Sequence, residues 1–220
     1  MRKKAIIVLS ALAVPLLVRN LYLIFLPVPD VGGQGAIDRL IYLHAPAAFT
    51  AYSGFFAALV ASILFLLKKE FRYDSLAVAA TEVSLTFAVV SMATGAIWSR
   101  RVWGIWWTWD AGLTVMSVCF LLYLSYLSLR PAIEEPTARA RLTAVYSIFA
   151  FADIPIVWYT IQWLRTESPA PAFRGGGMQP SGLFANWPAF MMVAAVLVLL
   201  RLQQEEMRRE IDGLRRLAHA

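Results

Sequence analysis

Long apolar segments alternate with short polar ones along the chain. Six of them approach the roughly 20 residues that a helix needs to cross about 30 Å of hydrocarbon. They occupy residues 5–26, 47–67, 76–98, 112–129, 142–163 and 187–202. A charged tail, residues 203–220, carries Met207, Ile211 and Leu214 at near-helical spacing, so we expect it to lie on the inner leaflet or against a partner. The pattern predicts an all-α, polytopic membrane protein with a single domain of six transmembrane helices.

Composition agrees with this class of protein. The 220 residues are 60% hydrophobic and only 15% charged, which is typical of membrane proteins. The N-terminal Met-Arg-Lys-Lys precedes an apolar run without a small-residue cleavage site, and we interpret it as an uncleaved first span. The single cysteine, Cys119, lies inside the fourth predicted span, which excludes a disulfide framework and a C-x-x-C-H motif.

Basic residues near the span ends predict the orientation. With a cytoplasmic N-terminus, the inner segments hold fourteen Lys and Arg residues and the outer segments hold five. Both termini are therefore expected on the cytoplasmic side. The same distribution accounts for the formal net charge of +6, so nucleic acid need not be invoked as a partner.

The tryptophans all fall on the outer side of this topology. They are Trp98, Trp103, Trp106, Trp107, Trp109, Trp158, Trp163 and Trp187. An interfacial aromatic belt would place indoles at both membrane surfaces, so it explains the isolated Trp98 and Trp187 better than the cluster. The stretch WGIWWTWD, residues 103–110, is poorly suited to a core because successive side chains point in different directions. It is expected to contact something large, apolar and external.

As a helix, this stretch would place Trp103, Trp106 and Trp107 on one face, followed by Asp110, with Trp109 beside them. Such a face is a stacking platform for a flat macrocycle. Arg100 and Arg101 precede it, and guanidinium groups bind carboxylates in bidentate fashion. A flat apolar ring that bears carboxylates describes heme.

A histidine lies at the same predicted surface. His44 ends the first outer loop, so we expect its imidazole to project at the outer membrane surface, where it could ligate heme iron. A lone histidine at a helix N-terminus also serves as a cap or an interfacial polar residue. Asp30, Gln34 and Arg39 on this loop are available to hold His44 or a propionate. The only other histidine, His219, is on the cytoplasmic tail and cannot meet His44 across the bilayer.

These segments resemble a known family. WGIWWTWD resembles the tryptophan-rich motif of the heme-handling proteins of cytochrome c biogenesis. Asp30, Gln34, Gly35 and Arg39, followed by IYLHAP at residues 41–46, resemble the first outer loop of the cytochrome c maturation protein C family. IPIVWYTIQWLRT, residues 154–166, resembles that family's fifth span and the loop after it. Length and span number also agree, so the resemblance covers nearly the whole chain.

The resemblance implies that the protein binds heme b transiently at the periplasmic face of the bacterial inner membrane. It implies delivery to a periplasmic heme chaperone, and association with the permease and ATPase subunits of an ABC transporter and with a small single-span subunit. His44 is then the axial ligand of the iron. The other heme-binding positions are Trp103, Gly104, Trp106, Trp107, Trp109, Asp110, Arg39, Arg100, Arg101, Asp30, Gln34 and Trp163.

Two positions depart from the family. Members carry a second axial histidine a few residues after the Trp-x-Arg-Thr run, where this chain has Ser168. Met178 in the same loop is a conceivable soft ligand for the other side of the iron. Members also carry an arginine two residues after the motif's Asp, where this chain has Gly112, and Arg100 or Arg101 could substitute for it.

Three ionisable residues, Arg19, Glu82 and Asp153, lie inside predicted spans, where charges are usually paired. Similar expected depths lead us to pair Arg19 with Asp153. The chain has no ATP-binding motif and no catalytic triad, so any catalysis would consist of orienting heme for the chaperone's histidine. A solute transporter would need a continuous polar path, a quinone-linked cytochrome b would need histidines inside the spans, and a larger heme lyase would need a longer chain.

Overall fold

The computed structural model describes residues 2–25, 39–109, 111–156, 159 and 180–218. Within these ranges it contains helices and no strand. The elements are α1 (Arg2–Phe25), α2 (Ile41–Lys68), α3 (Phe71–Trp103), α4 (Ala111–Leu129), the short 3-10 turn η2 (Arg130–Ala132), α5 (Pro136–Phe151) and α8 (Pro180–Ala218). Five helices in this part of the chain are long and apolar enough to cross a membrane. The prediction of an all-α polytopic membrane protein is confirmed.

The membrane-spanning helices correspond to five of the six predicted spans. They are α1, α2, α3, α4 and α8. The fifth predicted span, residues 142–163, begins within α5, and its last residues lie outside the described ranges. The predicted sixth span and tail form one continuous helix, α8, of 39 residues. The exact number of spans and the side on which the termini lie stay predictions.

The helices begin and end at capping residues in the polar segments that separate the apolar runs. α2 ends because Lys69 adopts a left-handed conformation (φ 57°), and its N–H donates to the Phe65 carbonyl at 2.8 Å. α3 begins two residues later, so α2 and α3 form an antiparallel hairpin. α5 begins with Pro136 in its first turn, and the Glu135 carboxylate accepts hydrogen bonds from the N–H groups of Thr137 and Ala138.

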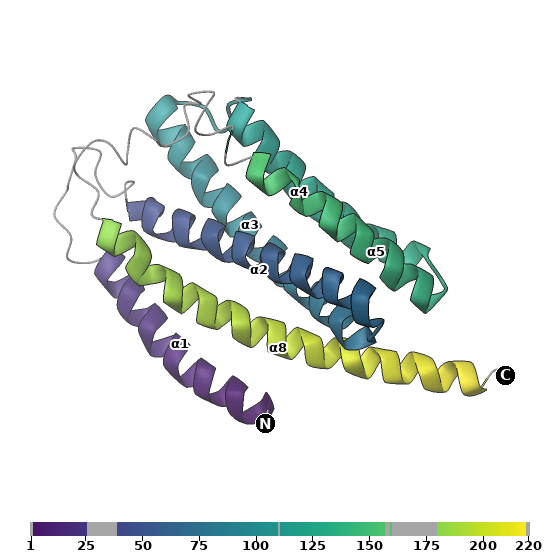
Figure 1. The fold of residues 1–220 in the computed structure, drawn as a ribbon. Helices are drawn as coiled ribbons and strands as arrows, with labels where there is room; N and C mark the ends of the chain where they lie inside the picture. Colours follow the sequence, from purple (N-terminus) through teal and green to yellow (C-terminus); the bar gives the residue numbers. More distant parts are fainter. Residues whose placement is uncertain (1, 26–38, 110, 157–158, 160–179, 219–220) are drawn as a thin grey trace.

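Small residues bring α2 and α3 close together at the centre of the molecule (Figure 1). Their buried small residues include Ala47, Ala51 and Ala58 on α2 and Ala80 and Ser84 on α3. A Cβ atom added to Gly54 would lie 2.0 Å from the Ser84 hydroxyl oxygen, so even an alanine there requires the Ser84 side chain to move. Helices in lipid associate through this kind of close packing, because apolar burial provides little driving force between them.

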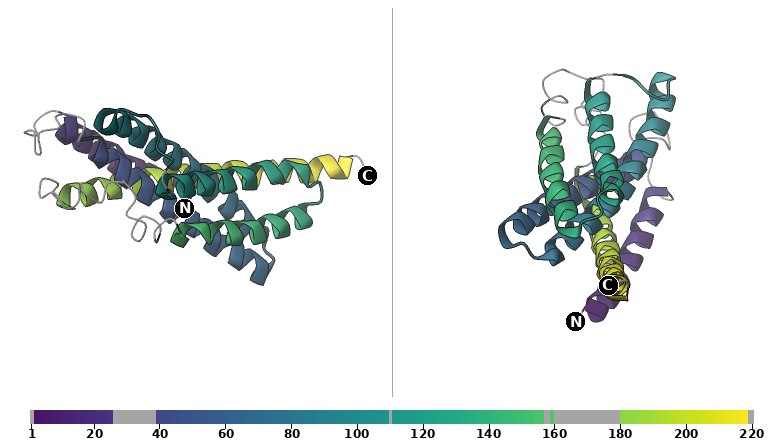
Figure 2. Two further views of the ribbon diagram at one scale, coloured as in Figure 1. Left: turned by 90° about the horizontal axis from the view of Figure 1, so that it is seen from above. Right: turned by 90° about the vertical axis from the view of Figure 1, so that its right-hand side faces the viewer.

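The other helices surround this pair. α8 packs against both α2 and α3, and α1 packs against α8 (Figure 1). α4 and α5 lie on the other side of the pair (Figure 2). There Tyr123 of α4 stacks on Phe55 of α2 with ring centroids 3.8 Å apart. α1 exposes Ile7, Leu12 and Val18, which is the expected surface of a helix that faces lipid.

The charges inside the spans are paired differently from our expectation. Glu82 accepts hydrogen bonds from Arg201 of α8, one of them at 2.8 Å. The predicted pairing of Arg19 with Asp153 is wrong: Arg19 donates to Asn20 at 3.3 Å, and one carboxylate oxygen of Asp153 is buried without a hydrogen-bond partner among the described residues. The reason is the helix arrangement, because α1 packs on α8 and lies on the opposite side of the bundle from α5 (Figure 1).

Candidate functional site

His44 lies in the first turn of α2, because this helix begins at Ile41, earlier than the predicted span. Its half-buried side chain therefore packs against α3 instead of projecting from the end of the loop. The imidazole Nδ1 lies 2.8 Å from the Ser91 carbonyl oxygen and 3.4 Å from the hydroxyl oxygens of both Ser91 and Thr94. His44 is thus held at one end of the α2–α3 hairpin.

This contact determines which ring nitrogen can bind a ligand. A carbonyl oxygen is only an acceptor, so Nδ1 carries the proton and donates it to Ser91. In the neutral tautomer, Nε2 then keeps its lone pair. Histidines that ligate metals have this arrangement, in which a hydrogen bond from the second nitrogen to a carbonyl sets the tautomer and orients the ring.

Three positions on α3 around His44 were missed by the sequence analysis. Ser91, Thr94 and Gly95 are small residues at i, i+3 and i+4, which places them on one helix face, directly before Trp98. Gly95 makes room for the imidazole, since an added Cβ would lie 2.9 Å from Cε1 of His44 and 3.2 Å from Nδ1. The run of small residues was a usable signal, but the sequence could not show that it faces His44.

The helical arrangement considered for residues 103–110 does not hold for the described residues 104–109. α3 ends at Trp103, and Gly104 adopts a left-handed conformation (φ 78°) in which its N–H donates to the Arg100 carbonyl at 3.1 Å. Residues 104–109 are an irregular segment. The indoles are therefore presented by a turn, and they do not share one helical face.

The indoles form two edge-to-face pairs. Trp98 and Trp103 have ring centroids 5.1 Å apart, and Trp107 and Trp109 have centroids 6.2 Å apart. Trp106 is 60% exposed and Trp109 is 79% exposed. So much bare indole surface is costly in water, which marks the segment as a surface for a flat apolar ligand or for lipid.

The turn is fixed by polar residues from the end of α3. Arg100 donates to the Gly104 carbonyl, and the Ser99 hydroxyl donates to the Ile105 carbonyl at 2.9 Å. Arg100 keeps further N–H groups for a ligand, and Arg101 is exposed. Arg39 lies just before α2, in a short 3-10 turn at residues 39–40.

The start of α8 reaches the same end of the bundle. Asn186 donates to the Tyr42 carbonyl at 3.2 Å, and the rings of Trp187 and Phe49 are 5.8 Å apart. The indole N–H groups of Trp107 and Trp187 are buried and find no acceptor among the described residues. Buried donors without a partner are uncommon in native proteins, so these two groups are available to an acceptor outside the described residues.

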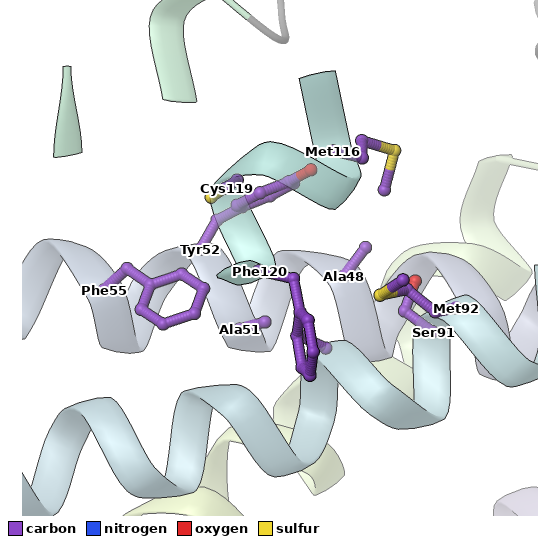
Figure 3. Close-up of a pocket in the computed structure, with 10 residues that line it drawn as sticks. Ala48, Ala51, Tyr52, Phe55, Ser91, Met92, Met116, Cys119 and Phe120 are labelled. Atoms are coloured by element: carbon purple, nitrogen blue, oxygen red, sulfur yellow. The ribbon is translucent and has the colours of Figure 1, made fainter. Parts of the chain in front are cut away.

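One cavity lies next to His44 but is too small for a macrocycle. Its volume is about 30 Å³, space for a water molecule. Figure 3 shows its lining from α2, α3 and α4, which includes Ala48, Ser91, Met92, Met116 and Cys119. A flat ring therefore does not fit inside this cavity.

The described site residues thus come from three helices, α2, α3 and α8, and lie at one end of the bundle. Gly95 and Trp103 are eight residues apart, about 12 Å along the axis of α3, so His44 and the tryptophan segment lie at the same end of the hairpin. Asp30, Gln34, Asp110, Trp163, Ser168 and Met178 lie outside the described residues. His44 is the only histidine in the part of the chain that the structure describes, so a cytochrome b arrangement with paired histidines between helices finds no support there.

Comparison with known proteins identifies relatives along almost the entire chain. The family model described as heme exporter protein C matches residues 1–217. The heme exporter protein C of Paracoccus denitrificans is 33% identical over 193 residues, 84% of this chain and 80% of that protein. The Bradyrhizobium diazoefficiens protein of that name is 32% identical over 204 residues, which cover 92% of this chain and 77% of that protein. The Escherichia coli K12 protein of that name is 29% identical over 180 residues, which cover 77% of this chain and 71% of that protein.

The agreement extends beyond any single motif. A match of this length includes α1 and α8, which hold few of the candidate site residues, as well as the segment between them. It also agrees with the resemblance in the tryptophan-rich segment and the first outer loop. The chain belongs to the heme exporter protein C family.

Proposed function

We propose that this protein binds heme b at the outer end of the α2–α3 hairpin and passes it on for the maturation of c-type cytochromes. The contact that carries the proposal is the hydrogen bond from His44 Nδ1 to the Ser91 carbonyl at 2.8 Å, which leaves Nε2 free to ligate the iron. Relatives named heme exporter protein C support heme as the cargo.

The tryptophan segment supplies the surface for the ring. Trp106 and Trp109 are the most exposed indoles among the described residues, and they offer flat apolar faces. The buried N–H groups of Trp107 and Trp187 are donors for the acidic edge of heme. Arg39, Arg100 and Arg101 supply positive charge for the propionates. Asp30, Gln34, Asp110 and Trp163 complete the proposed set from the neighbouring loops.

Transfer requires that the iron keep a coordination position for an outside ligand. Ser168 stands where the family resemblance implies a second histidine, so in this proposal the chain supplies one strong axial ligand, His44, with Met178 as the candidate on the other side. A weak or absent second ligand lowers the cost of replacing it by the histidine of a periplasmic heme chaperone. We place the protein in the bacterial inner membrane, with the permease and ATPase of an ABC transporter and a small single-span subunit as partners.

Complementation of bacterial cells that lack their own copy of this protein tests the proposed function. Expression of the chain is expected to restore covalent heme on the periplasmic chaperone, measured by the peroxidase activity of the heme-bearing band in a denaturing gel. The Trp106→Ala, Trp109→Ala double variant should lower that signal roughly tenfold, because two stacking faces are lost. Phe149→Ala removes an equally exposed ring from α5, far from the site, and should change nothing. Equal chaperone loading with and without the protein would contradict the proposal.

Gly95→Ala tests the position of His44 without removing a ligand. The new methyl group would lie 2.9 Å from His44 Cε1, which displaces the imidazole from Ser91. We expect heme affinity, measured by absorbance titration of the purified protein, to fall about tenfold or more. The variant should fold, since alanine favours a helix by about 1 kcal/mol over glycine. Gly213→Ala is the matched control, because nothing lies within 4 Å of its added Cβ. An unchanged affinity in Gly95→Ala would show that the orientation of His44 is unimportant.

A further inference from the structure

α8 is longer than a membrane crossing requires. Its 39 residues span about 58 Å at 1.5 Å per residue, whereas the hydrocarbon core measures about 30 Å. The charged residues begin at Arg201 and continue to the end of the helix. Figure 2 shows this charged half extending past the other helices. The C-terminal turns therefore lie outside the apolar layer.

Ion pairs determine which face of this extension points to the bundle. Arg201 pairs with Glu82 and Arg209 pairs with Asp74, both on α3, and the carboxylate of Glu206 pairs with Arg2 of α1. Glu205, between these positions, is buried. Because α8 is one unbroken helix held by these contacts, its last turns continue in the direction of the span.

The opposite face carries an apolar stripe with coiled-coil spacing. Met207, Ile211 and Leu214 are 48%, 50% and 67% exposed, and Leu200 is 41% exposed. Leu200, Met207 and Leu214 recur every seven residues, and Leu197, Gln204, Ile211 and Ala218 fall between them at the alternate positions of the same heptad. At 100° per residue, this stripe lies about opposite to Glu205.

We propose that this stripe pairs with the same stripe of a second copy of the chain, as a parallel two-stranded coiled coil. Two copies inserted with one topology must present their α8 helices in the same direction, which makes the pairing parallel and in register. β-branched Ile211 at one core position and Leu214 at the other are the combination that favours two strands. The polar Gln204 at a core position fixes the register.

Charges beside the stripe complement each other in this register. Glu210 precedes the core residue Ile211, and Arg215 follows the core residue Leu214, so Glu210 of one copy faces Arg215 of the second copy. Both side chains are exposed in the single chain, that of Arg215 to 73%. The face is therefore self-complementary in both its apolar positions and its flanking charges, as an isologous interface requires.

Cysteine cross-linking in intact membranes tests the pairing directly. A tagged and an untagged copy of the full chain, both in a Cys119→Ser background, are expressed together at low level. Met207→Cys or Leu214→Cys is expected to yield, after mild oxidation, a tagged–untagged disulfide product of twice the 24.6 kDa chain mass. Gly213→Cys is the matched control, since it lies on the same exposed turn but off the stripe, and it should give at least about fivefold less product.

Charge reversal tests the register. Glu210→Arg in the Leu214→Cys background should lower the cross-linked fraction about fivefold, and adding Arg215→Glu should restore it. Absence of cross-linking at both stripe positions, equal cross-linking at Gly213→Cys, or products formed only with a chain of another mass would overturn the proposal. So would independent effects of the two charge reversals.

Discussion

Replacing Asp74 with asparagine is expected to destabilise the folded protein by about 3–5 kcal/mol. Both carboxylate oxygens of Asp74 accept hydrogen bonds from Arg130 at 2.8 Å, and Arg209 of α8 donates to the same group. The side chains of Arg130 and Asp74 are only 10% and 3% exposed. Asp74→Asn therefore leaves the guanidinium of Arg130 buried without its counter-charge.

This carboxylate joins three parts of the chain, because α3 holds Asp74, η2 holds Arg130 and α8 holds Arg209. The midpoint of thermal unfolding in detergent is expected to fall clearly in Asp74→Asn. Glu206→Gln is the control, since it also removes a carboxylate from an interhelical arginine pair, but that pair is 36% and 39% exposed. The control should lose less than about 1 kcal/mol.

A double variant separates pairing from packing. Asp74→Asn with Arg130→Gln removes both buried charges and should recover part of the stability lost in Asp74→Asn. If Asp74→Asn and Glu206→Gln unfold at the same temperature, the buried pair contributes no more than an exposed one, and the account of how α8 is held is wrong.

The second large effect concerns His44. In His44→Gly we expect the affinity for heme to fall by about two orders of magnitude, because the iron loses its only strong protein ligand among the described residues. Added imidazole should restore binding in part, since the small side chain leaves space for a free ring beside Ser91. Ser91→Ala is the matched control: it removes a hydroxyl at 3.4 Å but keeps the carbonyl that accepts from Nδ1, and its affinity should stay within a few-fold of the unmodified protein.

Heme titration by absorbance measures these affinities. Unchanged binding by His44→Gly, or equal losses in His44→Gly and Ser91→Ala, would show that His44 only packs against α3. Imidazole rescue distinguishes a lost ligand from a damaged fold, because an unfolded site cannot be restored by a small molecule.

Helix positions were predictable from the sequence because apolar length is set by the membrane. The residues at 112–129 were predicted as a span, and α4 is Ala111–Leu129. The predicted pairing of Arg19 was wrong for a physical reason: depth along a helix follows from counting residues, but rotation and neighbours depend on packing. Glu82 finds Arg201 because α8 packs on α3, and no local pattern specifies that contact.

At the site, residue types were predictable and geometry was not. His44 and the tryptophans carry their chemistry in their side chains, whereas the hydrogen bond from His44 to Ser91 requires two helices to meet. Gly104 was an overlooked signal. A glycine after a long apolar helix commonly takes the left-handed conformation that ends it, and this explains why the indoles lie on a turn.

Resonance Raman spectroscopy of the heme-loaded protein with ¹⁵N-labelled histidine tests the central claim most directly. The chain has two histidines, so a His219→Ala variant retains His44 alone. In the ferrous form of this variant, the account predicts an iron–histidine stretching band that moves to lower frequency on labelling, and its loss in His44→Gly. If the protein binds heme but its spectrum contains no band that shifts on histidine labelling, ligation by His44 is contradicted.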